Sequence, residues 1–130
     1  CRANTSLGTS KVQAKTSGCS CMNPKEDGTM DTDCNCIHMP YCDGASFSGY
    51  RAEPWAVPNS TQKIWFRGIK NLDGVIDFAM SKGMTKATEF VITGGSAGGL
   101  STFLHADRVA GRLKAEAPSC TKIRAGRSQS

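Results

Sequence analysis

The apolar residues from position 69 to position 82 recur three and four residues apart, the spacing of a helix that buries one face. The repeat ends at Lys82-Gly83, and a basic residue followed by glycine is typical of a helix C-terminus. We therefore predict a helix of about 14 residues here. Its core-facing positions are Ile69, Leu72, Val75, Ile76, Ala79 and Met80.

Beyond this helix, an apolar, β-branched run predicts a strand, because Phe90-Val91-Ile92-Thr93 is bounded by Gly94-Gly95. Such a run is typical of a strand that is buried on both faces of a parallel sheet. A second amphipathic helix follows and is broken at Pro118. Its predicted apolar face consists of Leu100, Phe103, Leu104 and Leu113. We predict further short strands from Ile37 to Tyr41 and from Cys120 to Arg124.

This alternation of strands and helices predicts an α/β fold with a parallel sheet. The 130 residues are fewer than the roughly 200–250 that α/β catalytic domains commonly need, so we expect one partial catalytic domain. Residues 1–40 are predicted to be a Cys-rich loop segment, and residues 41–125 a core of strand, helix, strand, turn and helix. Residues 126–130 are predicted to be a divergent tail.

The cysteine content points to an oxidising compartment, since seven cysteines are many for a chain of this size. All seven are disulfide candidates: Cys1, Cys19, Cys21, Cys34, Cys36, Cys42 and Cys120. Two N-x-[ST] sequons, at Asn4 and Asn59, are glycosylation candidates and favour the same secreted location. A zinc site in the two C-x-C pairs with His38 is the less favoured alternative.

The net charge of +5 is spread along the chain, without the basic run that nucleic-acid binding usually shows. We therefore expect no nucleic-acid partner. No apolar stretch is long enough to cross a bilayer, so we expect no membrane span.

The segment Gly94-Gly95-Ser96-Ala97-Gly98 matches G-x-S-x-G, in which a serine sits on a sharp turn between a strand and a helix. The predicted strand and helix supply that context. We interpret Ser96 as the nucleophile and the backbone N–H of Ala97 as an oxyanion donor, at the positive end of the helix. This chemistry needs no metal and no cofactor.

A serine nucleophile needs a base, usually a histidine held by a carboxylate. His105 lies nine residues beyond Ser96 on the predicted helix, about 13 Å away on another face. His38, on the predicted strand before Cys42, also lies roughly 13 Å from the site. We therefore expect the catalytic Asp and His to lie outside this chain, which by itself should be inactive.

Three motifs resemble the pectin acetylesterase family, which includes Notum-type carboxylesterases. They are Tyr41-Cys42-Asp43-Gly44-Ala45-Ser46-Phe47-Ser48-Gly49, Phe66-Arg67-Gly68 and Gly95-Ser96-Ala97-Gly98-Gly99. The resemblance implies part of a secreted α/β-hydrolase-like esterase with a Ser-Asp-His triad, in which Ser96 is the nucleophile and Ala97 an oxyanion donor. It implies an acetylated cell-wall polysaccharide, or another acyl ester, as substrate.

Two alternatives stay open: a Notum-like lipid-acyl deacylase, and a non-catalytic secreted binding module on an esterase-like scaffold. Asp43, Gly44 and Ser46 are substrate-binding candidates, because their loop should leave the carboxyl end of a strand. We interpret Trp55, Trp65 and Phe66 as packing residues near a helix start rather than as cleft residues.

Overall fold

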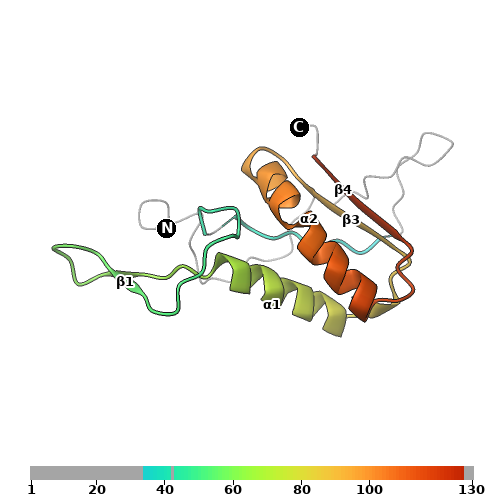
Figure 1. Cartoon of the computed structure of the whole chain (residues 1–130), viewed down its shortest axis with the longest axis horizontal. Helices are drawn as coiled ribbons and strands as arrows, with labels where there is room; N and C mark the ends of the chain where they lie inside the picture. Colours follow the sequence, from blue (N-terminus) through green and yellow to red (C-terminus); the bar gives the residue numbers. More distant parts are fainter. Residues whose placement is uncertain (1–33, 42, 128–130) are drawn as a thin grey trace.

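The computed structural model describes residues 34–41 and 43–127. Two helices pack beside a short parallel sheet, and a small hairpin projects away from them (Figure 1). The elements are β1 (Trp55–Ala56), β2 (Lys63–Ile64), α1 (Gly68–Ser81), a 3-10 turn η1 (Met84–Lys86), β3 (Glu89–Gly94), α2 (Ala97–Glu116) and β4 (Lys122–Arg127). In the described part of the chain, neither helix is long and apolar enough to cross a membrane.

Helix α1 forms where the apolar repeat predicts it. Four of the predicted core positions, Leu72, Ile76, Ala79 and Met80, are buried on one face, and Ile69 and Val75 are half-buried beside them. The chain leaves the helix through Gly83, whose φ of 108° is strained for any residue with a side chain. The predicted helix and its glycine stop are therefore confirmed.

Strands β3 and β4 form a parallel pair, as the alternation of elements predicts. Phe90 lies opposite Ile123 and Thr93 opposite Gly126, so β4 extends two residues into the predicted tail. The prediction that β3 is buried on both faces is wrong. Its residues alternate instead, with Phe90 and Ile92 half-buried against the core and Val91 38% exposed.

Helix α2 covers the sheet with a face that differs from the predicted one. Leu100, Phe103 and Leu104 are 55%, 70% and 55% exposed, whereas Leu113 is fully buried as predicted. The inward face begins instead with small and polar residues, because these allow the helix to approach the sheet closely. Its buried residues are Gly99, Ser101, Thr102, His105, Val109 and Leu113.

Two segments before α1 also differ from the prediction. Residues 37–41 contain no strand, whereas β1 and β2 form an antiparallel hairpin in a segment where the sequence predicts no strand. The hairpin has only two paired positions on each strand, Trp55 with Ile64 and Ala56 with Lys63. Strands this short have no alternating pattern long enough to recognise.

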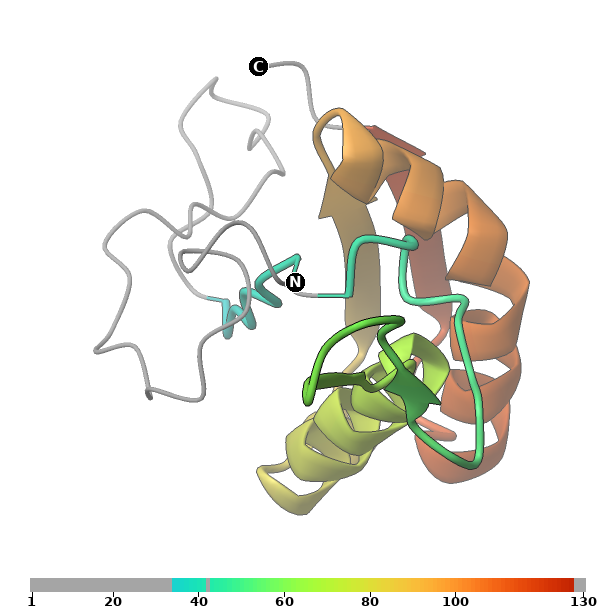
Figure 2. The same ribbon diagram turned by 90° about the vertical axis from the view of Figure 1, so that its left-hand side faces the viewer.

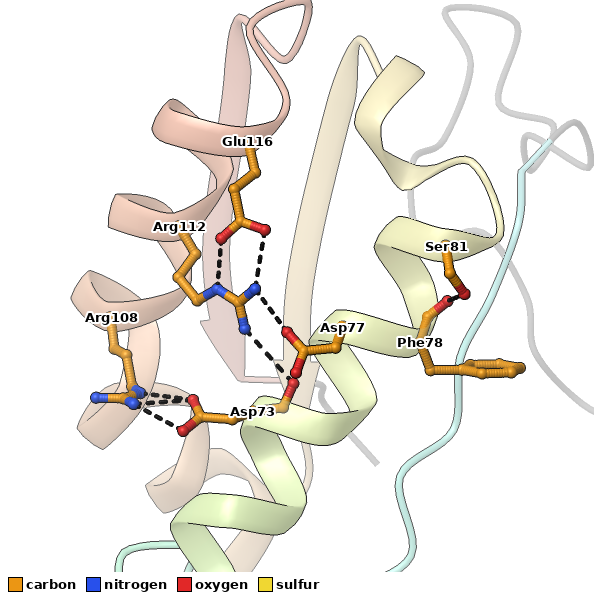
Figure 3. Close-up of polar contacts among 7 residues, drawn as sticks. All are labelled: Asp73, Asp77, Phe78, Ser81, Arg108, Arg112 and Glu116. Atoms are coloured by element: carbon orange, nitrogen blue, oxygen red, sulfur yellow. Dashed lines mark hydrogen bonds and ion pairs between the residues drawn. The ribbon is translucent and has the colours of Figure 1, made fainter.

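Ion pairs join α1 to α2 along their outer sides (Figure 3). Arg108 donates to both carboxylate oxygens of Asp73, at 2.9 Å each. Arg112 bridges Asp77, at 2.7 Å, and Glu116 one turn further along α2. The hydrogen bond and charge of Arg112 hold the pKa of Glu116 below its ordinary value. The two helices are therefore tied together on the side away from the sheet.

This network predicts a pH-dependent effect of Glu116→Gln. The folded-state pKa of Glu116 is lowered, so its ion pair adds stability above the ordinary pKa of 4.5 and loses it as the pH falls through the folded value. We expect the variant to unfold at a lower temperature than wild type at neutral pH, and the difference to shrink below pH 4.5. Thermal unfolding from neutral pH to about pH 2.5 measures it. A difference that is the same at every pH would contradict the assignment, and Arg112→Met should remove the same pH dependence.

Candidate functional site

Ser96 occupies the turn between β3 and α2 in a conformation that residues with side chains rarely adopt. Its φ is 49° and its ψ is −119°. A non-glycine residue in such a region costs on the order of 1–3 kcal/mol, and strain of this kind persists only where the surroundings enforce it. The turn carries the chain from the last strand residue, Gly94, into the first turn of α2 within two residues.

Glycines on either side make the sharp turn possible. A Cβ on Gly94 would lie 2.5 Å from the carbonyl carbon and oxygen of Gly98, so strand and helix touch through bare backbone. Gly98 itself has open space where its own Cβ would be. Packing therefore requires a glycine at position 94 but not at position 98.

We predict that Gly94→Ala and Gly98→Ala have opposite effects on stability. The first forces strand and helix apart and should lower the free energy of unfolding by about 1–3 kcal/mol. The second meets no atom within 4 Å and replaces a helical glycine, so it should raise that free energy by up to about 1 kcal/mol. Denaturant midpoints of both variants test this pair. Equal destabilisation by the two changes would show that strand and helix do not touch at Gly94.

The turn exposes a hydroxyl beside an unused backbone donor. Ser96 is exposed, and within the described residues its hydroxyl makes no hydrogen bond. The N–H of Ala97 also has no acceptor there, whereas that of Gly98 donates to Gly95 at 2.8 Å. Free N–H groups at a helix N-terminus, together with the helix dipole, favour negative charge at this point. The arrangement can therefore hold an anion or a developing oxyanion next to the Ser96 hydroxyl.

Neither histidine is bonded to Ser96. The ring of His105 is buried, and its Nε2 lies 2.7 Å from the carbonyl oxygen of Ser46. This nitrogen therefore donates to a loop that lies 59 residues earlier in the chain. The sequence does not indicate this contact, because no short-range pattern connects His105 with Ser46. His38 is exposed, in the segment before position 42.

The loop that contains Asp43, Gly44 and Ser46 lies against the middle of α2 (Figure 2). Ser46 is buried, and its backbone N–H donates to the Tyr41 hydroxyl at 3.1 Å. Asp43 accepts the N–H of Ala45 through Oδ1, and its buried Oδ2 has no hydrogen-bond partner among the described residues. Substrate contact by these three residues stays a prediction. In the structure Ser46 holds the loop against α2 through His105, and the Asp43 carboxylate lies beside the first residue of α1.

The predicted modification sites have different outcomes. Asn59 is exposed in the turn between β1 and β2, where a glycan could be attached, and Asn4 lies outside the described residues. Cys120 is a free thiol whose side chain is buried in the core. The disulfide prediction is therefore wrong for this residue. Disulfides of Cys34 and Cys36 stay predictions. The other candidates, Cys1, Cys19, Cys21 and Cys42, lie outside the described residues.

Comparison with known proteins gives a consistent result. The chain matches the family described as Pectinacetylesterase over residues 1–126. Pectin acetylesterase 11 of Arabidopsis thaliana is 36% identical over 125 residues, which are 95% of this chain and 30% of that protein. Palmitoleoyl-protein carboxylesterase NOTUM of Schmidtea mediterranea is 34% identical over 83 residues, 63% of this chain and 15% of that protein. No solved structure matches the chain.

The chain thus spans less than a third of the length of these relatives. The family match covers nearly all of it, including the segments from Tyr41 to Gly49 and from Gly95 to Gly99 on which the sequence resemblance rests. The resemblance is therefore confirmed. This chain belongs to the pectinacetylesterase family.

Proposed function

We propose that the protein to which this chain contributes hydrolyses carboxylic esters with Ser96 as its nucleophile. The observation that carries the proposal is the strained, exposed Ser96 on the turn between β3 and α2, beside the free N–H of Ala97. Family membership supports it, because relatives named as a pectin acetylesterase and as a palmitoleoyl-protein carboxylesterase share an ester bond as the bond to be cleaved.

In the proposed reaction the Ser96 oxygen attacks the acyl carbonyl carbon while a base takes the hydroxyl proton. The negative charge moves to the carbonyl oxygen, where the N–H of Ala97 and the N-terminus of α2 stabilise it. The bond to the alcohol then breaks, and the proton passes to the departing oxygen. Water, activated by the same base, cleaves the acyl-serine and regenerates Ser96.

We propose that the base and its supporting carboxylate, a histidine and an aspartate, come from outside this chain. His105 is committed to the Ser46 carbonyl by a 2.7 Å contact, which supports this assignment. The parallel β3–α2–β4 unit with its serine turn also supports an α/β-hydrolase-like fold for the whole domain. The 130-residue chain on its own is then an inactive part of the enzyme.

For the substrate we propose acetyl esters of a cell-wall polysaccharide, reached through a secretory route. The name of the plant relative supports an acetylated pectin, and the cysteines and the exposed Asn59 support secretion. A lipid acyl group is the alternative that the NOTUM relative supports. Asp43, Gly44 and Ser46 are proposed to shape the substrate site.

A chimera tests the proposal, because this chain corresponds to one continuous part of a known relative. Residues 1–126 would replace the matching segment of Pectin acetylesterase 11, which supplies the remaining part of its own chain, about 70%. We expect a fluorophosphonate to label the chimera at Ser96 and free acetylated pectin to slow the labelling. A folded chimera that is not labelled would instead favour a non-catalytic binding module.

A further inference from the structure

An exposed cluster of aromatic and basic side chains lies next to the hairpin. Tyr50 and Trp65 are 55% and 60% exposed, although the sequence predicts Trp65 to be a packing residue. The guanidinium carbon of Arg67 lies 5.1 Å from the centre of the Trp65 ring and 5.4 Å from that of Tyr50. The exposed Lys70 extends the cluster, with its Nζ 5.6 Å from the Tyr50 ring.

The cluster is held in place by backbone contacts. The Arg67 guanidinium donates to the carbonyl oxygens of Arg51 and Ala52, and the N–H of Arg51 donates to the carbonyl of Phe66 at 3.0 Å. These bonds join the two arms of the chain that lead into the hairpin. Trp65 and Arg67 therefore present a surface whose geometry is set before any ligand arrives, which lowers the entropic cost of binding.

The chemistry of this surface fits a sugar that carries carboxylates. An exposed indole offers a flat apolar face, and the C–H faces of pyranose rings stack on such surfaces. The basic side chains Arg51, Lys63, Arg67 and Lys70 outnumber the single acid, Glu53, between positions 50 and 70. Ammonium and guanidinium groups pair with carboxylates, so the charge of the segment complements an acidic ligand.

We propose that Tyr50, Trp65, Arg67 and Lys70 form a docking patch for an acidic polysaccharide built from uronic acid units. Trp65 stacks on one sugar ring, and Lys70 pairs with the carboxylate of a neighbouring unit. Arg67 keeps the two aromatic rings in position. The proposal rests on the proposed function for the kind of polymer, and it adds a place where the polymer is held apart from the ester bond that is cleaved at Ser96.

Binding of an oligogalacturonate to the purified 130-residue chain tests the patch, with isothermal titration calorimetry as the measurement. We expect Trp65→Ala and Lys70→Gln each to weaken binding by about tenfold. Trp55→Ala is the matched control, because Trp55 is also exposed on the hairpin but has no contact with the cations of the cluster. It should bind like wild type, and near-UV circular dichroism should be the same for all the variants compared.

Two further ligands separate the proposal from its rivals. A fully methyl-esterified oligogalacturonate has the same ring faces without the charges, so it should bind at least several-fold more weakly. Polyglutamate has the charges without the sugar rings, and it should bind no better than the methyl-esterified oligogalacturonate. Equal binding of polyglutamate would show a basic site that binds any acidic polymer, such as an acidic protein segment, and would overturn the proposal. Unchanged binding by Trp65→Ala would also overturn it.

The chimera with Pectin acetylesterase 11 gives a second, independent readout. Trp65→Ala should raise KM for polymeric acetylated pectin about tenfold, while kcat and the hydrolysis of a small chromogenic acetyl ester stay unchanged. Equal losses on both substrates would mean that Trp65 supports the fold rather than the polymer. A chimera without any esterase activity would count against the proposed function alone, since the calorimetric binding does not depend on Ser96.

Discussion

Replacing Ser96 by alanine in the chimera with Pectin acetylesterase 11 is expected to lower kcat for acetyl ester hydrolysis by a factor on the order of 10³ or more. Removal of the attacking oxygen leaves no group that can form the acyl intermediate, whereas the N–H groups at the start of α2 remain. The measurement is release of a chromogenic acetyl ester at neutral pH, with KM determined in parallel.

A serine elsewhere on the chain provides the control for this experiment. Ser119 is exposed in the turn between α2 and β4, so Ser119→Ala should leave both kcat and phosphonate labelling unchanged. Ser96→Ala should abolish labelling without changing the thermal midpoint by more than a few degrees. If Ser96→Ala keeps most of the activity, another residue is the nucleophile and the turn has only a structural role.

Leu113→Ala is expected to lower the free energy of unfolding strongly. Leu113 is fully buried on α2 and belongs to the cluster that joins both helices to the sheet. Truncation of such a leucine removes its transfer free energy and leaves a cavity, at a cost of about 2–5 kcal/mol. Chemical denaturation, read from the midpoint and slope of the transition, measures the loss.

Leu104→Ala is the matched control, because it is the same truncation on the same helix. Leu104 is 55% exposed and faces away from the sheet, so the change should alter the free energy of unfolding by no more than about 0.5 kcal/mol. A large loss at Leu104 and a small one at Leu113 would mean that α2 is rotated about its axis relative to this structure.

The parts of the fold that the sequence predicts are those with long, regular patterns. Helix α1 has apolar residues at helical spacing from Ile69 to Met80 and a glycine stop at Gly83, and the β-branched run from Phe90 to Thr93 predicts the strand β3, although not its half-exposed state. The strand at Lys122–Arg127 follows from alternation of elements. In each case local chemistry and the final packing favour the same structure.

The orientation of α2 could not be predicted in the same way. Leu100, Phe103 and Leu104 are the most apolar residues of its first half, and a hydrophobicity rule places them inside. The face toward the sheet instead contains Gly99 and Thr102, because close approach of backbones there depends on side-chain size rather than on polarity. No local pattern reports on the space available between two elements.

In the candidate site, too, the sequence predicts the short-range features and not the long-range contacts. The turn at Ser96 is a short-range feature, so its glycines and its neighbouring strand and helix are visible in five consecutive residues. The contact of His105 with Ser46 joins residues 59 positions apart, and the stacking of Arg67 on Tyr50 depends on how the hairpin closes. Contacts of this kind form only when distant segments come together in the folded chain, so no sequence pattern predicts either of these two contacts.

The two outer edges of the β3–β4 pair are chemically unequal, and this bears on how the protein behaves in solution. In the part of the chain that the structure describes, each of these strands pairs only with the other. Along β4, Lys122 is exposed and Arg124 is 55% exposed while it pairs with Glu89 of β3 at 3.0 Å, and charged side chains at an edge discourage the addition of another strand. The β3 edge has the apolar centre Phe90, Val91 and Ile92. Self-association by strand addition is therefore expected to start at β3, and a lysine in place of the exposed Val91 should suppress it.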